Sequence, residues 1–251
     1  MFFTKTFTQK KGLSGLLLFA LLFLISCAAQ PHFTHEQDLQ QIYLNAVRDA
    51  EIAEPAEISK NLLAIVESDP SLRWREQLEG KQLLVVTWTS WDGYDHQIGK
   101  TMNTSREIWV TVVPELLDFC TRQALPEKHK ILRLEQLLGL PPDNGKTRFV
   151  ELWVSPDDLF RPAPDPEITD HEAELDFPKS SQFITVSEEH KQWFNHLKNT
   201  SYQENPYPWT RLGYTYDWGN PKSEVGLSEF VIRAGARIDI HSVNRIEDYC
   251  K

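Results

Sequence analysis

The chain has 251 residues, of which 41% are hydrophobic and 25% charged, and its formal net charge at pH 7 is −10. That length can bury the core of one large domain or of two small ones. An acidic chain without lysine and arginine clusters lacks the surface that nucleic-acid phosphates require, so no nucleic-acid partner is expected. No metal site and no cofactor is predicted, since the sequence has no zinc-spaced cysteine cluster and no glycine-rich phosphate loop.

The N-terminus has the features of an export signal. Lys5, Lys10 and Lys11 make its start basic, and residues 13–25 (LSGLLLFALLFLI) form an uncharged apolar run. The run is shorter than the roughly 20 residues that a membrane-spanning helix needs, and the chain turns polar directly after Cys27. These features favour a signal sequence.

The apolar run ends in Leu24-Ile25-Ser26-Cys27. This ending resembles the lipobox of bacterial lipoproteins, in which an aliphatic residue and a small residue precede the cysteine. The resemblance covers only the leader. It implies that residues 1–26 are removed, that Cys27 carries lipid, and that residues 27–35 tether a soluble domain of residues 36–251 to a membrane of the cell envelope. Ala28 in the next position is typical of sorting to the outer membrane. The alternative is a secretory signal that is cut elsewhere, with Cys27 incidental.

Lipidation of Cys27 leaves two further cysteines, Cys120 and Cys250. An even pair in an oxidising compartment predicts a disulfide. Two buried free thiols are the alternative.

Two segments after the tether place apolar side chains at helical spacing, residues 36–52 and residues 54–67. Pro55 suits the first turn of the second segment, and Asp69-Pro70 would end it. We therefore expect an N-terminal helical hairpin.

The rest of the chain mixes strand and helix patterns. β-Branched and aromatic residues predict strands over residues 83–89, 107–113 and 148–154, and a final hairpin over residues 229–232 and 237–241. Helices are expected over residues 115–123, 128–138 and 187–198. The expected fold is a single α+β domain, with the helical hairpin followed by a mixed, largely antiparallel sheet with flanking helices.

The first candidate site is the loop of residues 161–178, which is rich in proline and acids. Clustered carboxylates suit hard cations such as calcium, but the glycine that an EF-hand needs for its sharp turn is missing. A solvated acidic loop is the simpler interpretation.

The second candidate is the loop that follows the first strand. Asp92, Asp95 and His96 offer carboxylates and an imidazole beside Trp91 and Tyr94. Loops at strand ends often carry catalytic groups, and histidine is the usual acid or base near neutral pH. Asp92 is equally suited to the first position of a turn.

The third candidate is an aromatic stretch before the last strands. Its residues are Trp209, Arg211, Tyr214, Tyr216, Asp217 and the later Glu229. Aromatic rings can stack on a sugar or a nucleobase while charged groups bind its edges. We expect a cleft here. The alternative is an Arg211–Asp217 ion pair that covers an aromatic core.

Two function classes follow from these patterns. The first is an envelope lipoprotein that acts as a binding or interaction module, contacting the membrane through its lipid and a glycan or a protein through its domain. The second is a lipid-anchored hydrolase or transferase that uses the carboxylates near residues 91–96 or 209–229. Convergence of these side chains in one cleft would favour the enzyme, and scattering would favour the binding module.

Overall fold

The computed structural model describes residues 35–250 except residues 79, 124–125 and 181–184. The expected signal sequence, Cys27 and most of the tether lie outside the described residues. Within the described part, none of the helices has the length and apolarity needed to cross a bilayer.

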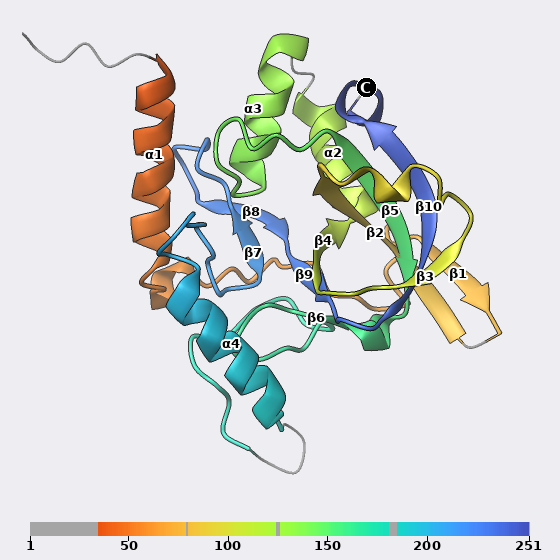
Figure 1. The fold of residues 1–251 in the computed structure, drawn as a ribbon. Helices are drawn as coiled ribbons and strands as arrows, with labels where there is room; N and C mark the ends of the chain where they lie inside the picture. Colours follow the sequence, from red (N-terminus) through yellow and green to blue (C-terminus); the bar gives the residue numbers. More distant parts are fainter. Residues whose placement is uncertain (1–34, 79, 124–125, 181–184, 251) are drawn as a thin grey trace, which may run out of the picture. The chain divides into compact units, whose positions relative to one another are not determined.

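The described chain is a single α+β domain built on an eight-stranded antiparallel sheet (Figure 1). The strands of this sheet are β1 (Trp74–Gln77), β2 (Gly80–Thr89), β3 (Thr101–Asn103), β4 (Ile108–Val112), β5 (Arg148–Val154), β6 (Leu159–Phe160), β9 (Phe230–Ile232) and β10 (Arg237–Arg245). They follow the order β3-β10-β5-β2-β4-β9-β6, and β1 pairs with β2. A separate two-stranded sheet holds β7 (Tyr214–Tyr216) and β8 (Val225–Ser228).

Five α-helices and three short 3-10 turns accompany the sheets in the described residues. The helices are α1 (His35–Ala50), α2 (Val113–Gln123), α3 (Glu127–Leu137), α4 (Glu188–Thr200) and α5 (Ile246–Tyr249). The 3-10 turns are η1 (Pro55–Glu57), η2 (Asp92–Tyr94) and η3 (Pro156–Asp158). Ser187 begins α4 as predicted, because its hydroxyl accepts a hydrogen bond from the His190 backbone N–H.

Alternation along β2 divides the hydrophobic core between two faces of the sheet. Leu84, Val86 and Trp88 pack in one cluster with side chains of α2, α3 and α5. Leu83 and Val85 point the other way, into a cluster formed with β4, β5, β9 and β10. The large sheet thus has helices on one face and a second core on the other.

The predicted helical hairpin is wrong in its second half. Residues 54–67 begin with the short turn η1 and then continue without helix. Their backbone N–H groups are committed to distant partners: Leu62 donates to the His171 carbonyl at 2.9 Å, and Ile65 to the Ile168 carbonyl at 2.7 Å. These tertiary hydrogen bonds replace the bonds to residue i−4 that a helix would need.

Two further expectations about the sheet need correction. The last two strands, β9 and β10, do not form the expected hairpin. Instead, β9 pairs with β4 and β6, whereas β10 pairs with β3 and β5. The sheet is also not mixed, since each described strand pair is antiparallel.

A disulfide joins Cys120 in α2 to Cys250, which directly follows α5, with their Cα atoms 5.0 Å apart. The bridge spans a sequence separation of 130 residues. It fastens the C-terminal end of the described chain to a helix that packs on the large sheet.

The acidic loop of residues 161–178 has neither helix nor strand, as expected. It folds around Arg161, which is fully buried and donates to the backbone carbonyls of Glu167 (2.9 Å) and Asp170 (3.0 Å). Across the described residues, no three His, Cys, Asp or Glu side chains are grouped as metal ligands would be. The loop is therefore organised by a buried arginine that binds main-chain carbonyls.

Candidate functional site

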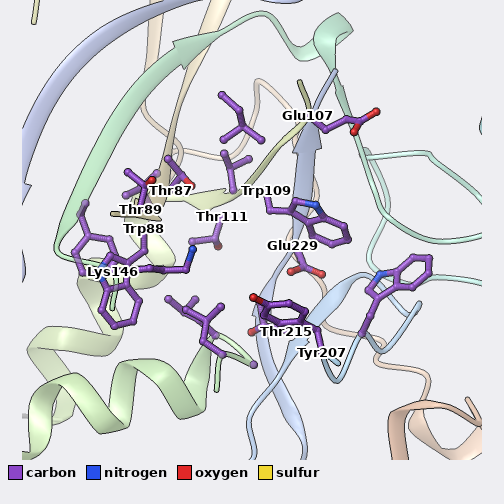
Figure 2. Close-up of a pocket in the computed structure, with 18 of the residues that line it drawn as sticks. Thr87, Trp88, Thr89, Glu107, Trp109, Thr111, Lys146, Tyr207, Thr215 and Glu229 are labelled. Carbon is purple, nitrogen blue, oxygen red and sulfur yellow. The ribbon is translucent and has the colours of Figure 1, made fainter. Parts of the chain in front are cut away.

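A cavity of about 510 Å³ opens where β2 and β4 separate. The two strands pair only at Val85–Val112 and Val86–Thr111. Beyond this point β2 continues along β5, while β4 pairs with β9 on its other side. Residues 87–89 and 108–110 therefore diverge, and they line opposite walls of the cavity (Figure 2).

Other elements complete the lining. Leu116 of α2, Leu197 of α4 and the segment that follows α3 contribute apolar surface. Gly139 ends α3 with a φ of 63°, and a Cβ atom there would lie 3.3 Å from the Tyr216 backbone nitrogen. Glycine thus allows the end of α3 to approach β7 closely.

Aromatic rings form much of the cavity wall. Trp109 and Trp209 meet edge to face with ring centroids 6.2 Å apart, and Trp91 meets Tyr94 in the same way at 4.5 Å. Trp88 stacks on the core ring of Phe149 at 5.2 Å. Such walls suit a ligand with a flat apolar body, because aromatic pairs prefer offset or edge-to-face contacts.

Two of these tryptophans keep an unused hydrogen-bond donor. The Nε1 atoms of Trp88 and Trp209 are buried and have no partner among the described residues. The two side chains are only 6% and 5% exposed. Buried donors without a partner are rare in folded proteins, and these two lie beneath the cavity surface, where solvent does not reach them.

Glu229 carries the buried carboxyl of the cavity. It lies between β8 and β9, where its backbone N–H donates to the Gly213 carbonyl at 2.9 Å. The carboxyl forms no hydrogen bond or ion pair with another described residue, and burial raises its pKa to about 8. Glu229 is therefore mostly a neutral acid at pH 7, able both to donate and to accept a hydrogen bond.

Lys146 brings a cation to the opposite end of the cavity. It follows a turn after α3, in which its backbone N–H donates to the Asn144 side chain at 2.8 Å. Burial lowers the pKa of the ammonium, and the positive charge of Arg106 lowers it further. Figure 2 shows Lys146 entering the cavity from the Trp88 side with its ammonium directed toward Thr111, while Glu229 lies on the other side of the cavity.

A second buried carboxyl lies directly behind the cavity wall. Glu115 of α2 accepts hydrogen bonds from the Ser228 hydroxyl (3.2 Å) and the Thr111 hydroxyl (3.4 Å). Burial raises its pKa to about 7, and the hydrogen bonds from Ser228 and Thr111 partly oppose that rise. Thr111 also lines the cavity.

The cavity collects parts of both aromatic candidate sites. Trp209, Tyr216 and Glu229 of the third candidate line it, and so do Trp91 and Tyr94 of the second. The two sequence segments therefore contribute to one site.

The polar residues of the second candidate do not line this cavity. Asp95 pairs with Arg148 at 3.2 Å, and Asp92 accepts the Asp95 backbone N–H within the turn η2. His96 is exposed. The turn interpretation of Asp92 therefore matches the structure.

The remaining residues of the third candidate bind other parts of the protein. Arg211 donates to the backbone carbonyls of Ala50 (3.3 Å) and Glu51 (2.8 Å) at the end of α1. The Tyr214 hydroxyl donates to the Glu57 carbonyl at 2.9 Å. Asp217 forms a two-pronged ion pair with Arg133, at 2.7 and 2.5 Å, so the Arg211–Asp217 pair does not form.

Sequence reasoning missed Trp88, Trp109 and Lys146. Both tryptophans sit in strand patterns, where a large ring is the normal choice for a core position. Lys146 lies in a turn-rich stretch, where lysine is usually solvated. These three residues line one cavity only because β2 and β4 separate.

Comparisons with protein-family models, with curated proteins and with solved structures found no match.

Proposed function

We propose that this chain is an envelope lipoprotein, anchored by lipid at Cys27, whose domain binds a small organic molecule in the cavity between β2 and β4. The observation that carries the proposal is the cavity itself, with aromatic walls and with the Glu229 carboxyl, which forms no hydrogen bond with another described residue. Ligand sites are typically mainly apolar pockets of this size with a few convergent polar groups. The disulfide supports an oxidising compartment outside the cytoplasm.

A hydrolase or transferase is supported less well. A glycosidase, for example, needs two carboxyl groups on either side of the bond that it cleaves. Glu107, the other carboxylate residue of the lining, is exposed, and Figure 2 shows its carboxylate directed away from Glu229. Glu229 also forms no hydrogen bond or ion pair with another described side chain. These observations favour binding over catalysis.

The test is to fill the cavity. Residues 34–251 form a compact unit with their own hydrophobic clusters, so this domain can be studied without lipid or detergent. Its fluorescence titration with N-phenyl-1-naphthylamine, an uncharged aromatic probe, should show one saturable site. Thr87→Phe places a ring in the cavity from β2 and should abolish that site.

Thr185→Phe is the matched control, because Thr185 is exposed and lies outside the cavity lining. Leu197→Trp fills the cavity from α4 and replaces Thr87→Phe if that variant melts at a lower temperature than wild type. Equal binding by the wild type and a folded, cavity-filled variant would show that the probe binds elsewhere, and the proposal would fail.

A further inference from the structure

The cavity has one positively charged end. Lys146 extends into it from the turn before β5, and Arg106 lines the same cavity near enough for its charge to lower the pKa of the lysine. Among the described residues, neither side chain forms an ion pair with a carboxylate. The half-buried Lys146 and the exposed Arg106 thus bring two positive charges to the cavity without a counter-ion among the described residues.

Several other half-buried cations of the described residues do have a carboxylate partner. The half-buried arginines Arg75, Arg133 and Arg148 each meet an aspartate, at Asp239, Asp217 and Asp95 respectively. Acidic residues also outnumber basic ones by 36 to 26 in the whole chain. The chain therefore has enough acidic residues to pair with Lys146 and Arg106, yet the described structure places no carboxylate in an ion pair with either of them.

Two acidic side chains line the cavity, Glu107 and Glu229, and Figure 2 shows both on the opposite side from Lys146. Glu229 is uncharged when protonated, and it lies at the opposite end from Lys146 (Figure 2). The cations of the lining are therefore not offset by a carboxylate beside Lys146.

We propose, on the basis of the proposed function, that the ligand is a small organic anion. Its acidic group, a carboxylate, sulfonate or phosphate, binds Lys146 and Arg106. Its flat apolar body lies between Trp88 and Trp109, and a polar atom at its far end meets Glu229. A cavity of about 510 Å³ has room for such a body, since pockets for drug-sized ligands span roughly 300 to 1,000 Å³.

Two probes with the same rings isolate the contribution of the charge. 8-Anilinonaphthalene-1-sulfonate carries a sulfonate, and N-phenyl-1-naphthylamine is its uncharged counterpart. The domain of residues 34–251 should bind the sulfonate more tightly than the neutral probe. Lys146→Met should weaken binding of the sulfonate about ten-fold or more, because a hydrogen bond to a charged group is lost. Binding of the neutral probe should stay within about two-fold.

Matched variants test the location of the charge. Lys146→Arg keeps the charge and should retain most of the preference for the sulfonate. Lys100→Met removes an exposed lysine outside the lining and should change neither affinity. Melting temperatures close to that of the wild type confirm that each variant is folded.

The outcomes separate this inference from the proposed function. If neither probe binds the wild type in a way that Thr87→Phe abolishes, the cavity is not a binding site and both proposals fail. If both probes bind there with equal affinity, or if Lys146→Met weakens both equally, the cavity is a site but its ligand need not be an anion. Tighter binding of a quaternary naphthylmethyl ammonium ion would assign the site to cations and overturn the inference.

Discussion

Two buried carboxyl groups of this domain are held in different ways. Glu115 accepts hydrogen bonds from Ser228 and Thr111, and these partly oppose the effect of burial, so its pKa rises to about 7. Glu229 has no such bonds, and its pKa rises to about 8. A carboxyl that is left without partners in a cavity reduces stability whenever it ionises, which is common for groups that bind ligands.

The pH dependence of stability tests the state of Glu229. Its pKa is about 8 in the folded protein against an ordinary value of 4.5. Between these values the folded state keeps a proton that the unfolded state releases, so the free energy of unfolding falls as the pH rises. The slope from this group is at most about 1.4 kcal/mol per pH unit, and the contribution is constant above pH 8.

Glu229→Gln removes this titration. Urea denaturation at pH 5, 6.5 and 8 should show the variant gaining stability relative to the wild type as the pH rises. Glu107→Gln is the control, since it removes a carboxylate from an exposed position of the same lining. A difference between Glu229→Gln and wild type that is the same at all three pH values would mean that Glu229 is not a buried, neutral acid.

Arg211 has a structural role at the end of α1. Arg211 is only 7% exposed, and its φ is 61°. Its guanidinium donates to the backbone carbonyls of Ala50, the last residue of α1, and Glu51. A cation at a helix C-terminus stabilises the helix, and each hydrogen bond from a charged donor adds to this. Arg211→Ala should lower the free energy of unfolding by about 2 kcal/mol.

Binding of N-phenyl-1-naphthylamine should be unchanged by Arg211→Ala, because Arg211 does not line the cavity. Arg245→Ala, at an exposed position, is the control. Loss of probe binding with unchanged stability would return Arg211 to the ligand site that the sequence predicted.

At the scale of elements, long regular patterns were predictable and pairings were not. The strand predicted over residues 148–154 is β5, and the helix predicted from Ser187 is α4. Residues 54–67 have helical spacing, yet they form tertiary hydrogen bonds with the acidic loop instead. Local spacing cannot reveal such a partner, because the two segments lie about a hundred residues apart in the sequence.

The supposed final hairpin failed for a related reason. Ala234-Gly235 is a sound turn signal, and Gly235 indeed has a φ of 84°. The turn nevertheless joins strands on different parts of the sheet, since β9 pairs with β4 and β10 pairs with β5. A turn residue predicts a change of direction and says little about which strands become neighbours.

The disulfide fixes α5 to α2, and its removal should loosen the C-terminal end. In the chain-entropy treatment, a bridge that closes a loop of this length contributes about 3 to 5 kcal/mol. The double variant Cys120→Ser, Cys250→Ser should lose stability by about that amount. Amide exchange in α5 should accelerate more than in β5.

Peptide mapping without reductant checks the bridge itself. Protein purified from the cell envelope should yield a peptide that links Cys120 to Cys250. Free thiols at both positions in that material would contradict the disulfide.

At the scale of the whole molecule, the site was predictable only in part. Aromatic residues near Trp91 and Trp209 were recognised, because several large rings next to charged residues suggest a partly exposed surface. Lys146 and the free β4-side edge at the end of β2 were not, because they depend on where two strands separate. Arg211 and Asp217, which lie outside the cavity lining, show that a buried ion can serve the fold as readily as a ligand.

The anchor is a separate prediction about the precursor. Cys27→Ala should abolish incorporation of labelled fatty acid and move the full-length protein from the membrane to the soluble fraction, because the lipid supplies the attachment. Ser26→Ala keeps a small residue before the cysteine and should remain lipidated. A Cys27→Ala protein that still sediments with membranes after a high-salt wash would require another mode of attachment.

The most direct test of the ligand cavity is to see where a ligand binds. Crystals of the domain of residues 34–251 can be soaked in a bromonaphthalene sulfonate, and the bromine located by its anomalous scattering. We predict a bromine peak inside the cavity, between Trp88 and Trp109, that is absent from crystals of Thr87→Phe. Bromine peaks only on the outer surface of the domain, with the cavity unoccupied by the compound, would contradict it.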